Sequence, residues 1–129
     1  MKLVVSGASG LVGTHLTSLA QAQGHEVLGL SRSVRPGFAR WDPAGAAAGQ
    51  TKAVEDLRAA VDGADAIINL AGSSVDDGRL GPEHVAEVLR SRLDAGSALA
   101  HAWRACETPP PVWLQASAVG FYGDCGDEW

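Results

Sequence analysis

The sequence has little of several features that would point to particular protein classes. Its 129 residues include only two cysteines, Cys106 and Cys125, and one tyrosine. Two cysteines without a paired spacing predict no disulfide framework and favour a reduced chain. No apolar run approaches the ~18 residues of a membrane span, and the N-terminus lacks the pattern of a signal peptide. We therefore expect a soluble, cytoplasmic protein without a membrane partner.

Positive charge is also scarce. Ten lysines and arginines against fifteen acidic residues give a net charge of −5 at pH 7. Binding nucleic acid through counterion release needs the opposite balance, so we expect no nucleic-acid partner. A local basic site remains open, because Arg32, Arg35 and Arg40 cluster in the sequence. The four histidines do not combine with cysteines at the spacing of a zinc site, so no metal site is expected.

What the sequence does have is a strand, a glycine-rich turn and a helix at its N-terminus. Residues 2–6 contain the short apolar run Leu3-Val4-Val5, with two β-branched valines, which is typical of a buried parallel strand. From Leu11 the apolar residues recur at helical spacing as far as Gly24, which suits a helix end. A second strand is expected at residues 26–30. The order of these elements predicts a βαβ unit.

Three glycines lie between the first strand and the helix, at Gly7, Gly10 and Gly13. The first permits a sharp turn, the second lets the backbone approach a pyrophosphate, and the third lets the helix pack closely on the sheet. Free N–H groups at the helix N-terminus would then face the phosphates. An ordinary tight turn is the alternative. The flanking strands and helix favour dinucleotide binding.

The end of the second strand bears on the choice of dinucleotide. In this kind of fold an acidic residue there binds the ribose of NAD, whereas an arginine accommodates the 2′-phosphate of NADP. Ser31 and Arg32 offer a hydroxyl and a guanidinium, and no acid stands at this place. We therefore expect NADP rather than NAD as the cofactor. The alternative is that Arg32 is a solvated loop charge.

The rest of the chain predicts further alternation of helices and strands. Residues 33–50 are loop-like, with a short third strand at 38–42; then follow a helix at 52–63, a strand at 65–72, a helix at 82–105 and a strand at 112–117. This pattern predicts one α/β domain over residues 1–129. We expect a doubly wound parallel sheet with strand order 3-2-1-4-5, ending after the fifth strand.

For two sites near the expected cleft, the residues are consistent with either a ligand-binding role or a structural role. Residues 69–72 follow a buried strand and are placed to line the cleft, but Asn69 would equally serve to cap a loop. On the long helix the expected sheet-facing side carries Arg92 among apolar residues: Val85, Val88, Leu89, Leu93, Leu99, Ala100 and Trp103. An arginine on such a face is usually snorkelling or paired. It would otherwise reach into the cleft.

Taken together, these motifs resemble extended or atypical short-chain dehydrogenases/reductases. More narrowly they are similar to nucleoside-diphosphate-sugar epimerases of the NAD-dependent epimerase/dehydratase type, some of which are described as cell-division inhibitors. The matching stretches are residues 6–13, 24–27, 30–32, 41–42, 69–72, 91–93 and 117–123. The resemblance implies a bound NADP and a small-molecule substrate, such as a sugar nucleotide. It also implies members about twice this length, with a C-terminal substrate region that is absent here.

The resemblance assigns roles to individual positions along the dinucleotide. The pyrophosphate would be held by Gly7, Ser9, Gly10, Leu11 and Val12, the adenosine phosphate by Ser31 and Arg32, and the part toward the nicotinamide by Leu70, Ala71, Arg92, Ser117 and Ala118. This favours a cleft role for Arg92.

The catalytic residues of such enzymes are incomplete in this sequence. Short-chain reductases use a tyrosine activated by a lysine four residues later. Four residues after Tyr122 stands Gly126, so Tyr122 is not expected to be the catalyst. Ser117 matches the family's catalytic serine or threonine. The resemblance therefore implies the NADP-binding domain of an epimerase or reductase that transfers hydride at a hydroxyl or carbonyl carbon. A non-catalytic NADP(H)-binding regulatory module is the alternative.

One physical liability follows from the expected strand order. Residues 112–116 would form an edge strand with apolar side chains on both faces. Exposed apolar edges pair readily between chains, so we expect self-association through this strand.

Overall fold

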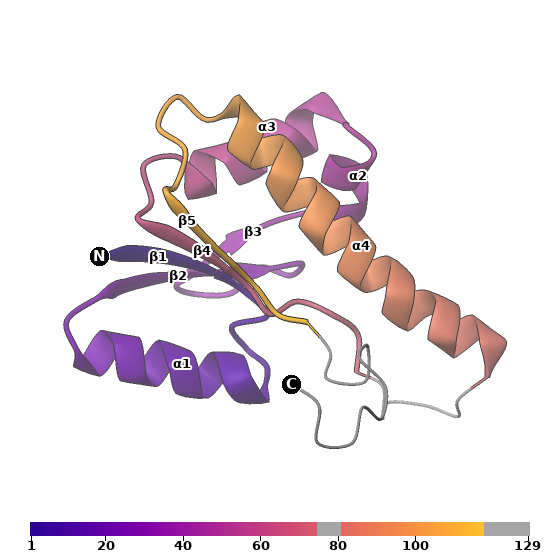
Figure 1. Cartoon of the computed structure of the whole chain (residues 1–129), viewed down its shortest axis with the longest axis horizontal. Helices are drawn as coiled ribbons and strands as arrows, with labels where there is room; N and C mark the ends of the chain where they lie inside the picture. Colours follow the sequence, from indigo (N-terminus) through magenta and orange to yellow (C-terminus); the bar gives the residue numbers. More distant parts are fainter. Residues whose placement is uncertain (75–80, 118–129) are drawn as a thin grey trace, which may run out of the picture.

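A computed structural model describes residues 1–74 and 81–117 as a five-stranded parallel sheet covered by helices on both faces (Figure 1). The elements are β1 (Lys2–Ser6), α1 (Leu11–Ala22), β2 (Glu26–Ser31), β3 (Phe38–Arg40), α2 (Pro43–Ala47), α3 (Thr51–Val61), β4 (Ala66–Asn69), α4 (Pro82–Ala105) and β5 (Val112–Gln115). The strand order is β3-β2-β1-β4-β5. The predicted fold class and strand order are confirmed.

The central strand β1 divides the hydrophobic core between the two faces of the sheet. It pairs in parallel with β2 on one side and β4 on the other. Because side chains alternate along a strand, Val4 packs with the helices α2, α3 and α4, whereas Leu3 and Val5 pack toward α1. Val4 and Val5 are both 0% exposed. Burial on both faces explains why this stretch is an unbroken apolar run.

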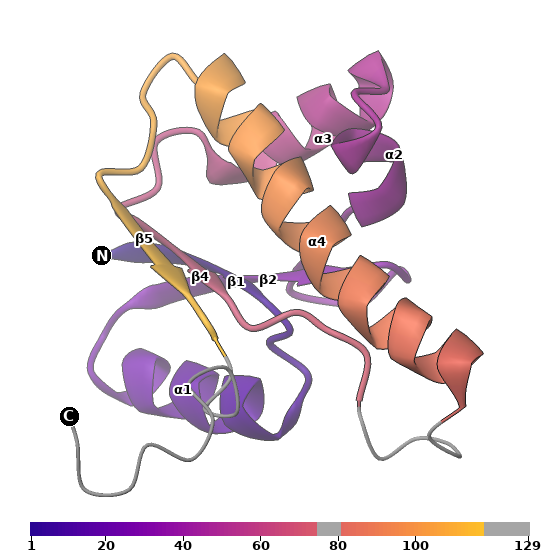
Figure 2. The ribbon, with the colours of Figure 1, turned by 45° about the vertical axis from the view of Figure 1, so that its right-hand side comes forward.

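The two faces of the sheet are covered unequally. Among the described residues, α1 is the one helix on its face, and α2, α3 and α4 cover the opposite face (Figure 2). None of the helices in the described ranges has the length and apolarity that crossing a bilayer requires.

The prediction that residues 33–50 are loop-like apart from a short strand at 38–42 is wrong in one part, because residues 43–47 form α2. Asp42 begins this helix by accepting a hydrogen bond from the backbone amide of Gly45 at 3.0 Å, and Pro43 occupies the first helical position. Gly45 and Ala46 are buried, and α2 makes extensive contacts with α4. Alanine and glycine give little hydrophobic periodicity, so a search for regularly spaced large apolar side chains does not detect this helix.

The predicted sheet-facing side of α4 is also wrong over the first half of the helix. Val85, Leu89 and Leu93 are 54–59% exposed. The buried residues of the helix all lie in its C-terminal half: Ala95, Ala98, Leu99 and Ala102. Close packing against α2 and α3 requires small side chains, and α4 therefore turns its alanines inward.

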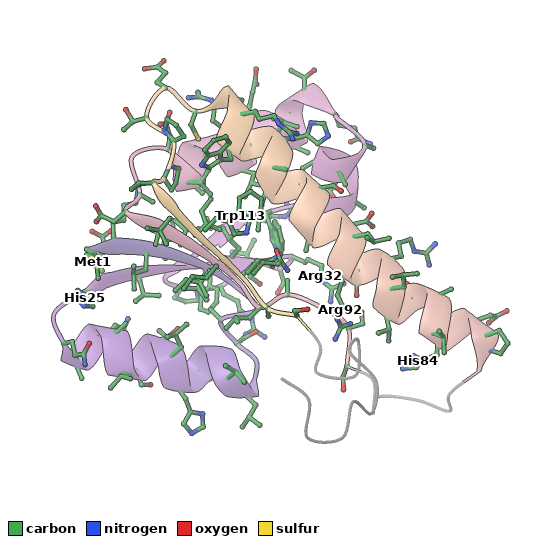
Figure 3. The ribbon with its side chains drawn as sticks, in the orientation of Figure 1. Met1, His25, Arg32, His84, Arg92 and Trp113 are labelled. Carbon is green, nitrogen blue, oxygen red and sulfur yellow. The ribbon has the colours of Figure 1, made fainter. Side chains whose placement is uncertain are left out.

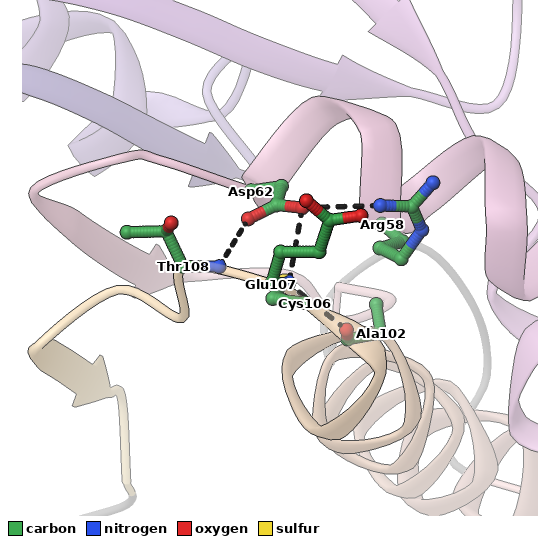
Figure 4. Close-up of polar contacts among 6 residues, drawn as sticks. All are labelled: Arg58, Asp62, Ala102, Cys106, Glu107 and Thr108. Atoms are coloured by element: carbon green, nitrogen blue, oxygen red, sulfur yellow. Dashed lines mark hydrogen bonds and ion pairs between the residues drawn. The ribbon is translucent and has the colours of Figure 1, made fainter.

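The loops that precede β4 and β5, at the amino ends of the strands, are joined through the carboxylate of Asp62 (Figure 4). Its oxygens accept hydrogen bonds from the backbone amides of Thr108 at 2.8 Å and Glu107 at 3.2 Å. Arg58 adds an ion pair at 3.0 Å. The amide of Gly63 completes the link by donating to the Thr108 carbonyl at 2.9 Å. One side chain thus fixes the approach of both strands.

These contacts change the acidity of two neighbouring groups. The Thr108 amide, then the Glu107 amide, lower the pKa of Asp62 below its ordinary value of 3.8, while partial burial opposes them and Arg58 adds a smaller lowering. Burial raises the pKa of the Cys106 thiol, and the Asp62 carboxylate raises it further. The Cys106 thiol donates to the Ala102 carbonyl at 3.3 Å. Cys106 therefore stays a protonated, packed thiol at neutral pH.

The lowered pKa of Asp62 predicts a pH-dependent contribution to stability. The contribution is present well above pH 3.8 and is lost as the pH falls through the lowered pKa of the folded state. We expect Asp62→Asn to lower the free energy of unfolding at pH 7 by more than Asp56→Asn does. Asp56 is the matched control because it makes only an exposed i,i+4 pair with Lys52.

Urea denaturation of both variants between pH 7 and pH 3 measures this. The deficit of Asp62→Asn relative to the wild-type chain should shrink as the pH falls. A deficit that stays constant over this range would show that the carboxylate charge is not what joins the loops.

β5 is one of the two edge strands of the described sheet and pairs with β4 alone, as β3 pairs with β2 alone at the other edge. Val112 and Leu114 point to the same face and are 46% and 55% exposed. We propose that this edge pairs with a second copy of the chain. Leu114→Lys should therefore shift the protein toward monomer in sedimentation velocity runs at high concentration, because an edge lysine blocks strand pairing.

Val34→Lys is the control for this comparison, since Val34 is 86% exposed and lies in a loop away from β5. Its sedimentation should match that of the wild-type chain. A wild-type sample that is monomeric and monodisperse at high concentration would refute the pairing.

Candidate functional site

An open cleft lies where the strands end, on the described part of the chain. Its volume is about 1160 Å³, and its walls come from the turn after β1, the ends of β2 and β3, the segment from α2 to α3, the exit of β4 and the middle of α4. In doubly wound sheets ligands bind outside the carboxyl ends of the strands, at the point where the strand order reverses. Here β1 is that point, with β2 and β4 leaving it in opposite directions.

Most of the predicted dinucleotide-binding residues line this cleft. They are Gly7, Ser9, Gly10, Ser31, Arg32, Leu70 and Ala71. Figure 3 shows Arg32 and Arg92 at the end of the sheet opposite to Met1 and His25. The topology thus gathers residues that are far apart in the sequence.

The turn after β1 depends on two positions that have no side chain. Gly7 has a positive φ of 71°, and a Cβ there would lie 2.6 Å from the Leu70 carbonyl oxygen. A Cβ at Gly13 would lie 2.6 Å from the α-carbon of Ala8. The backbone of the turn therefore packs directly on the exit of β4 and on the first turn of α1.

The N-terminus of α1 faces outward from this turn without a cap. Gly10 is its N-cap residue and makes no side-chain cap, and the first turn holds no acidic residue. The amide of Gly10 donates to the Gly7 carbonyl at 3.0 Å, which holds the turn closed. Amides at a helix N-terminus carry a partial positive charge and suit an anion. The residues present therefore fit a pyrophosphate.

A buried polar row fixes the exit of β4. Asn69, 1% exposed, accepts from the Ser6 hydroxyl and from the Ala71 amide, the latter at 3.2 Å. Its Nδ2 atom donates to the Gln115 side chain at 2.9 Å. Asn69 thus caps its own loop and cross-links three strands. It does not line the cleft, whereas Leu70, Ala71 and Gly72 do.

Arg92 lies over Gly72 with both of its observed hydrogen bonds made to backbone. Its Nη1 atom donates to the carbonyls of Ser73 at 3.0 Å and Val88 at 3.1 Å. A Cβ at Gly72 would lie 2.8 Å from the guanidinium carbon, so a larger residue there would displace the Arg92 side chain from this position. Arg92 joins α4 to the loop after β4 but is not one of the cleft-lining residues. Its contact with a nucleotide stays a prediction.

The remaining predicted positions lie around the cleft or outside the described part. Leu11 and Val12 point outward, 81% and 65% exposed, so their predicted role belongs to their amides. Ser117 is exposed just after β5 and is not a lining residue. Ala118 and Tyr122 lie outside the described residues. No cluster of three or more metal-ligating side chains occurs within residues 1–74 and 81–117.

The structure shows that one wall of the cleft extends from the end of the third strand into the segment from α2 to α3, which the sequence analysis did not assign to the site. Beyond Arg35 and Arg40, this wall includes Trp41, Asp42, Gln50, Lys52 and Asp56. Recognising Asp42-Pro43 as an N-cap followed by a helix would have found it. On the opposite wall α4 contributes Glu87 and Arg90, which form an ion pair at 3.0 Å.

The glycine contacts predict different consequences for two alanine substitutions. Gly13→Ala should lower the free energy of unfolding by about 1–3 kcal/mol, because its Cβ would overlap the turn backbone. Gly10→Ala should cost at most about 1 kcal/mol, since its Cβ would meet only the Gly7 carbonyl oxygen, at 3.3 Å. It should nonetheless weaken dinucleotide binding by holding the pyrophosphate away from the amides.

Denaturant titrations and fluorescence titrations with NADPH and NADH separate the two effects. If the Gly10→Ala variant binds both dinucleotides as tightly as the wild-type chain, the turn is not part of the binding site.

Comparison with known proteins agrees with this architecture. The sequence profile of the NAD dependent epimerase/dehydratase family matches residues 3–128. The chain is 33% identical over 124 residues to the human epimerase family protein SDR39U1, covering 95% of this chain and 38% of the relative. It is 33% identical over 129 residues to the epimerase family protein YfhF of Bacillus subtilis, with 95% and 39% coverage. The chain thus spans about two fifths of the length of these relatives.

Solved structures give the same result. The crystal structure of human SDR39U1 (isoform 2) with NADPH has a TM-score of 0.78 at 33% identity, over 95% of this chain and 38% of that one. The nucleoside-diphosphate sugar epimerase from Corynebacterium glutamicum has a TM-score of 0.71 at 33% identity, over 99% and 25%. Since the profile match extends over nearly the whole sequence, the chain belongs to the NAD-dependent epimerase/dehydratase family.

Proposed function

We propose that the cleft binds NADP and that the chain is the NADP-binding domain of a longer epimerase or reductase. The observation that carries this is the glycine turn, where Gly7 and Gly13 leave no room for a Cβ and the uncapped amides of α1 face outward. The human relative of known structure was crystallised with NADPH. A dinucleotide laid across this cleft would have its pyrophosphate at the turn.

The choice of NADP over NAD depends on the end of β2. Ser31 and Arg32 both line the cleft, and the Ser31 hydroxyl accepts from the Ser33 amide at 3.2 Å. No acidic residue stands at this strand end to bind a free ribose 2′-hydroxyl. A guanidinium there favours the 2′-phosphate of NADP.

NADP, when bound, supplies the acceptor or donor of a hydride at a hydroxyl or carbonyl carbon. The residues of this chain would bind and orient it: the turn amides at the pyrophosphate, Arg32 at the adenosine end, and Leu70 and Ala71 along the middle. Ser117 would hydrogen-bond the reacting oxygen of the substrate. A sugar nucleotide is the substrate class we propose, supported by the family and by the Corynebacterium relative.

A non-catalytic NADP(H)-binding regulatory module is the second proposal. It is supported by the residue four positions after Tyr122, which is Gly126 rather than lysine. Hydride transfer measured with this chain alone would exclude it. For location we propose the cytoplasm, supported by the small number and the spacing of the cysteines.

Titration with the two reduced dinucleotides tests the proposed cofactor. Arg32→Ala should raise the dissociation constant for NADPH by about 10- to 100-fold, as expected for loss of a hydrogen bond to a charged group. The dissociation constant for NADH should not change. The control is Arg104→Ala, because Arg104 is exposed in the last turn of α4 and is not part of the cleft.

Equal affinities of the wild-type chain for NADPH and NADH would contradict the proposed preference. Absence of binding for both dinucleotides would contradict the proposed function as a whole.

A further inference from the structure

The end of β3 places a second arginine beside the end of β2. In the parallel pairing of these strands, Ser31 lies opposite Arg40. The amide of Trp41 donates to the Ser31 carbonyl at 2.9 Å and extends this pairing by one step. Neighbouring strands lie about 4.8 Å apart, and residues in register point to the same face. Arg40 is therefore held next to the position where Ser31 and Arg32 meet the cleft.

The arginines on this wall are not paired with nearby acids in the described part of the chain. Arg32, Arg35 and Arg40 all line the cleft, and within the described ranges none forms an ion pair. Two acids on the same wall have other partners. Asp42 accepts from the Gly45 amide, and Asp56 pairs with Lys52. In a chain of net charge −5, this leaves a local concentration of guanidinium groups facing the cleft.

We propose that Arg40 is a second specificity residue, which together with Arg32 binds the 2′-phosphate of the adenosine ribose. The inference rests on the proposed binding of NADP and assigns part of the selectivity to β3. Two guanidinium groups at the ends of adjacent strands match a phosphomonoester, which offers three acceptor oxygens and close to two negative charges. A ribose with a free 2′-hydroxyl offers neither.

Arg40 differs from Arg35 in how its backbone is held. Arg40 is a strand residue paired with β2, whereas Arg35 lies in the loop between β2 and β3. A side chain on a fixed strand loses less conformational freedom when it binds a ligand than one on a loop. We therefore assign the second contact to Arg40, and Arg35→Ala becomes the matched comparison.

The experiment measures dissociation constants of the full chain for NADPH and NADH by fluorescence titration. Arg40→Ala should raise the constant for NADPH about tenfold and leave that for NADH unchanged. The NADPH dissociation constant of Arg40→Lys should lie between those of the wild-type chain and Arg40→Ala, because an ammonium keeps the charge but not the planar pair of donors. Arg35→Ala should raise the NADPH constant by less than Arg40→Ala does, and Arg104→Ala, a control outside the cleft, should leave both constants unchanged.

Competition by smaller nucleotides identifies the group that is recognised. The wild-type chain should bind 2′,5′-ADP more tightly than 3′,5′-ADP, and Arg40→Ala should remove most of that difference. Circular dichroism and thermal melts of each variant verify that the fold is unchanged.

The possible results separate this inference from the proposed function. If Arg32→Ala selectively weakens NADPH while Arg40→Ala has no effect, the role of Arg40 is refuted and the proposed cofactor stands. If Arg40→Ala weakens NADPH and NADH equally, Arg40 does not read the 2′-phosphate and the inference is also refuted. If the wild-type chain binds neither dinucleotide, both proposals fail together.

Discussion

The whole arrangement depends on a backbone-to-backbone contact that side chains would prevent. The turn after β1 packs against the peptide between Leu70 and Ala71, and the first turn of α1 packs against Ala8. These contacts bring the exits of the two central strands within van der Waals distance. They also set the direction in which α1 leaves the sheet. Without them the cleft would lose both its floor and the outward-facing amides, however well the sheet itself were formed.

Hydrogen bonds among three polar side chains on neighbouring strands hold the exit of β4, which takes part in this contact, in position. Ser6, Asn69 and Gln115 are register partners on β1, β4 and β5. A buried amide is costly unless its donors and acceptors are satisfied. Asn69 meets this requirement through Ser6, Gln115 and the amide of Ala71. The same bonds that satisfy Asn69 therefore position the loop that follows it.

The sequence was sufficient to predict the sheet, its order and most of the turn. Leu3, Val4 and Val5 form a run of large apolar residues, and after the glycines the apolar pattern changes from that of a strand to that of a helix. This change is a strong signal for the βα unit. The errors share one physical cause. Ala46 of α2 and Ala95, Ala98 and Ala102 of α4 are buried because helices approach closely there, and alanine gives only a weak hydrophobic pattern. The exposed Val85, Leu89 and Leu93 dominated the pattern instead.

The site residues also differed in how well the sequence predicted them. Positions whose role comes from the backbone, such as Gly7 and Gly13, were found because glycine itself is the signal. Positions whose role comes from side-chain direction were less accessible. Nothing in the spacing of Asn69 says that it turns inward, or that Arg92 bonds to the Ser73 carbonyl. The segment from α2 to the start of α3 was not recognised as a wall of the cleft, so Gln50 and Lys52 were not considered as neighbours of a ligand.

The acidic ties at the amino ends of the strands have a consequence for how such a domain diversifies. Asp62 joins the loops before β4 and β5, and Asp65 accepts from the Lys2 amide at the start of β1. These ties lie at the end of the sheet away from the cleft, so the loops that recognise ligands take no part in them. Substitutions that alter ligand choice can then accumulate at one end while the other end preserves the folded state. The parallel arrangement of the strands is what keeps these two tasks apart.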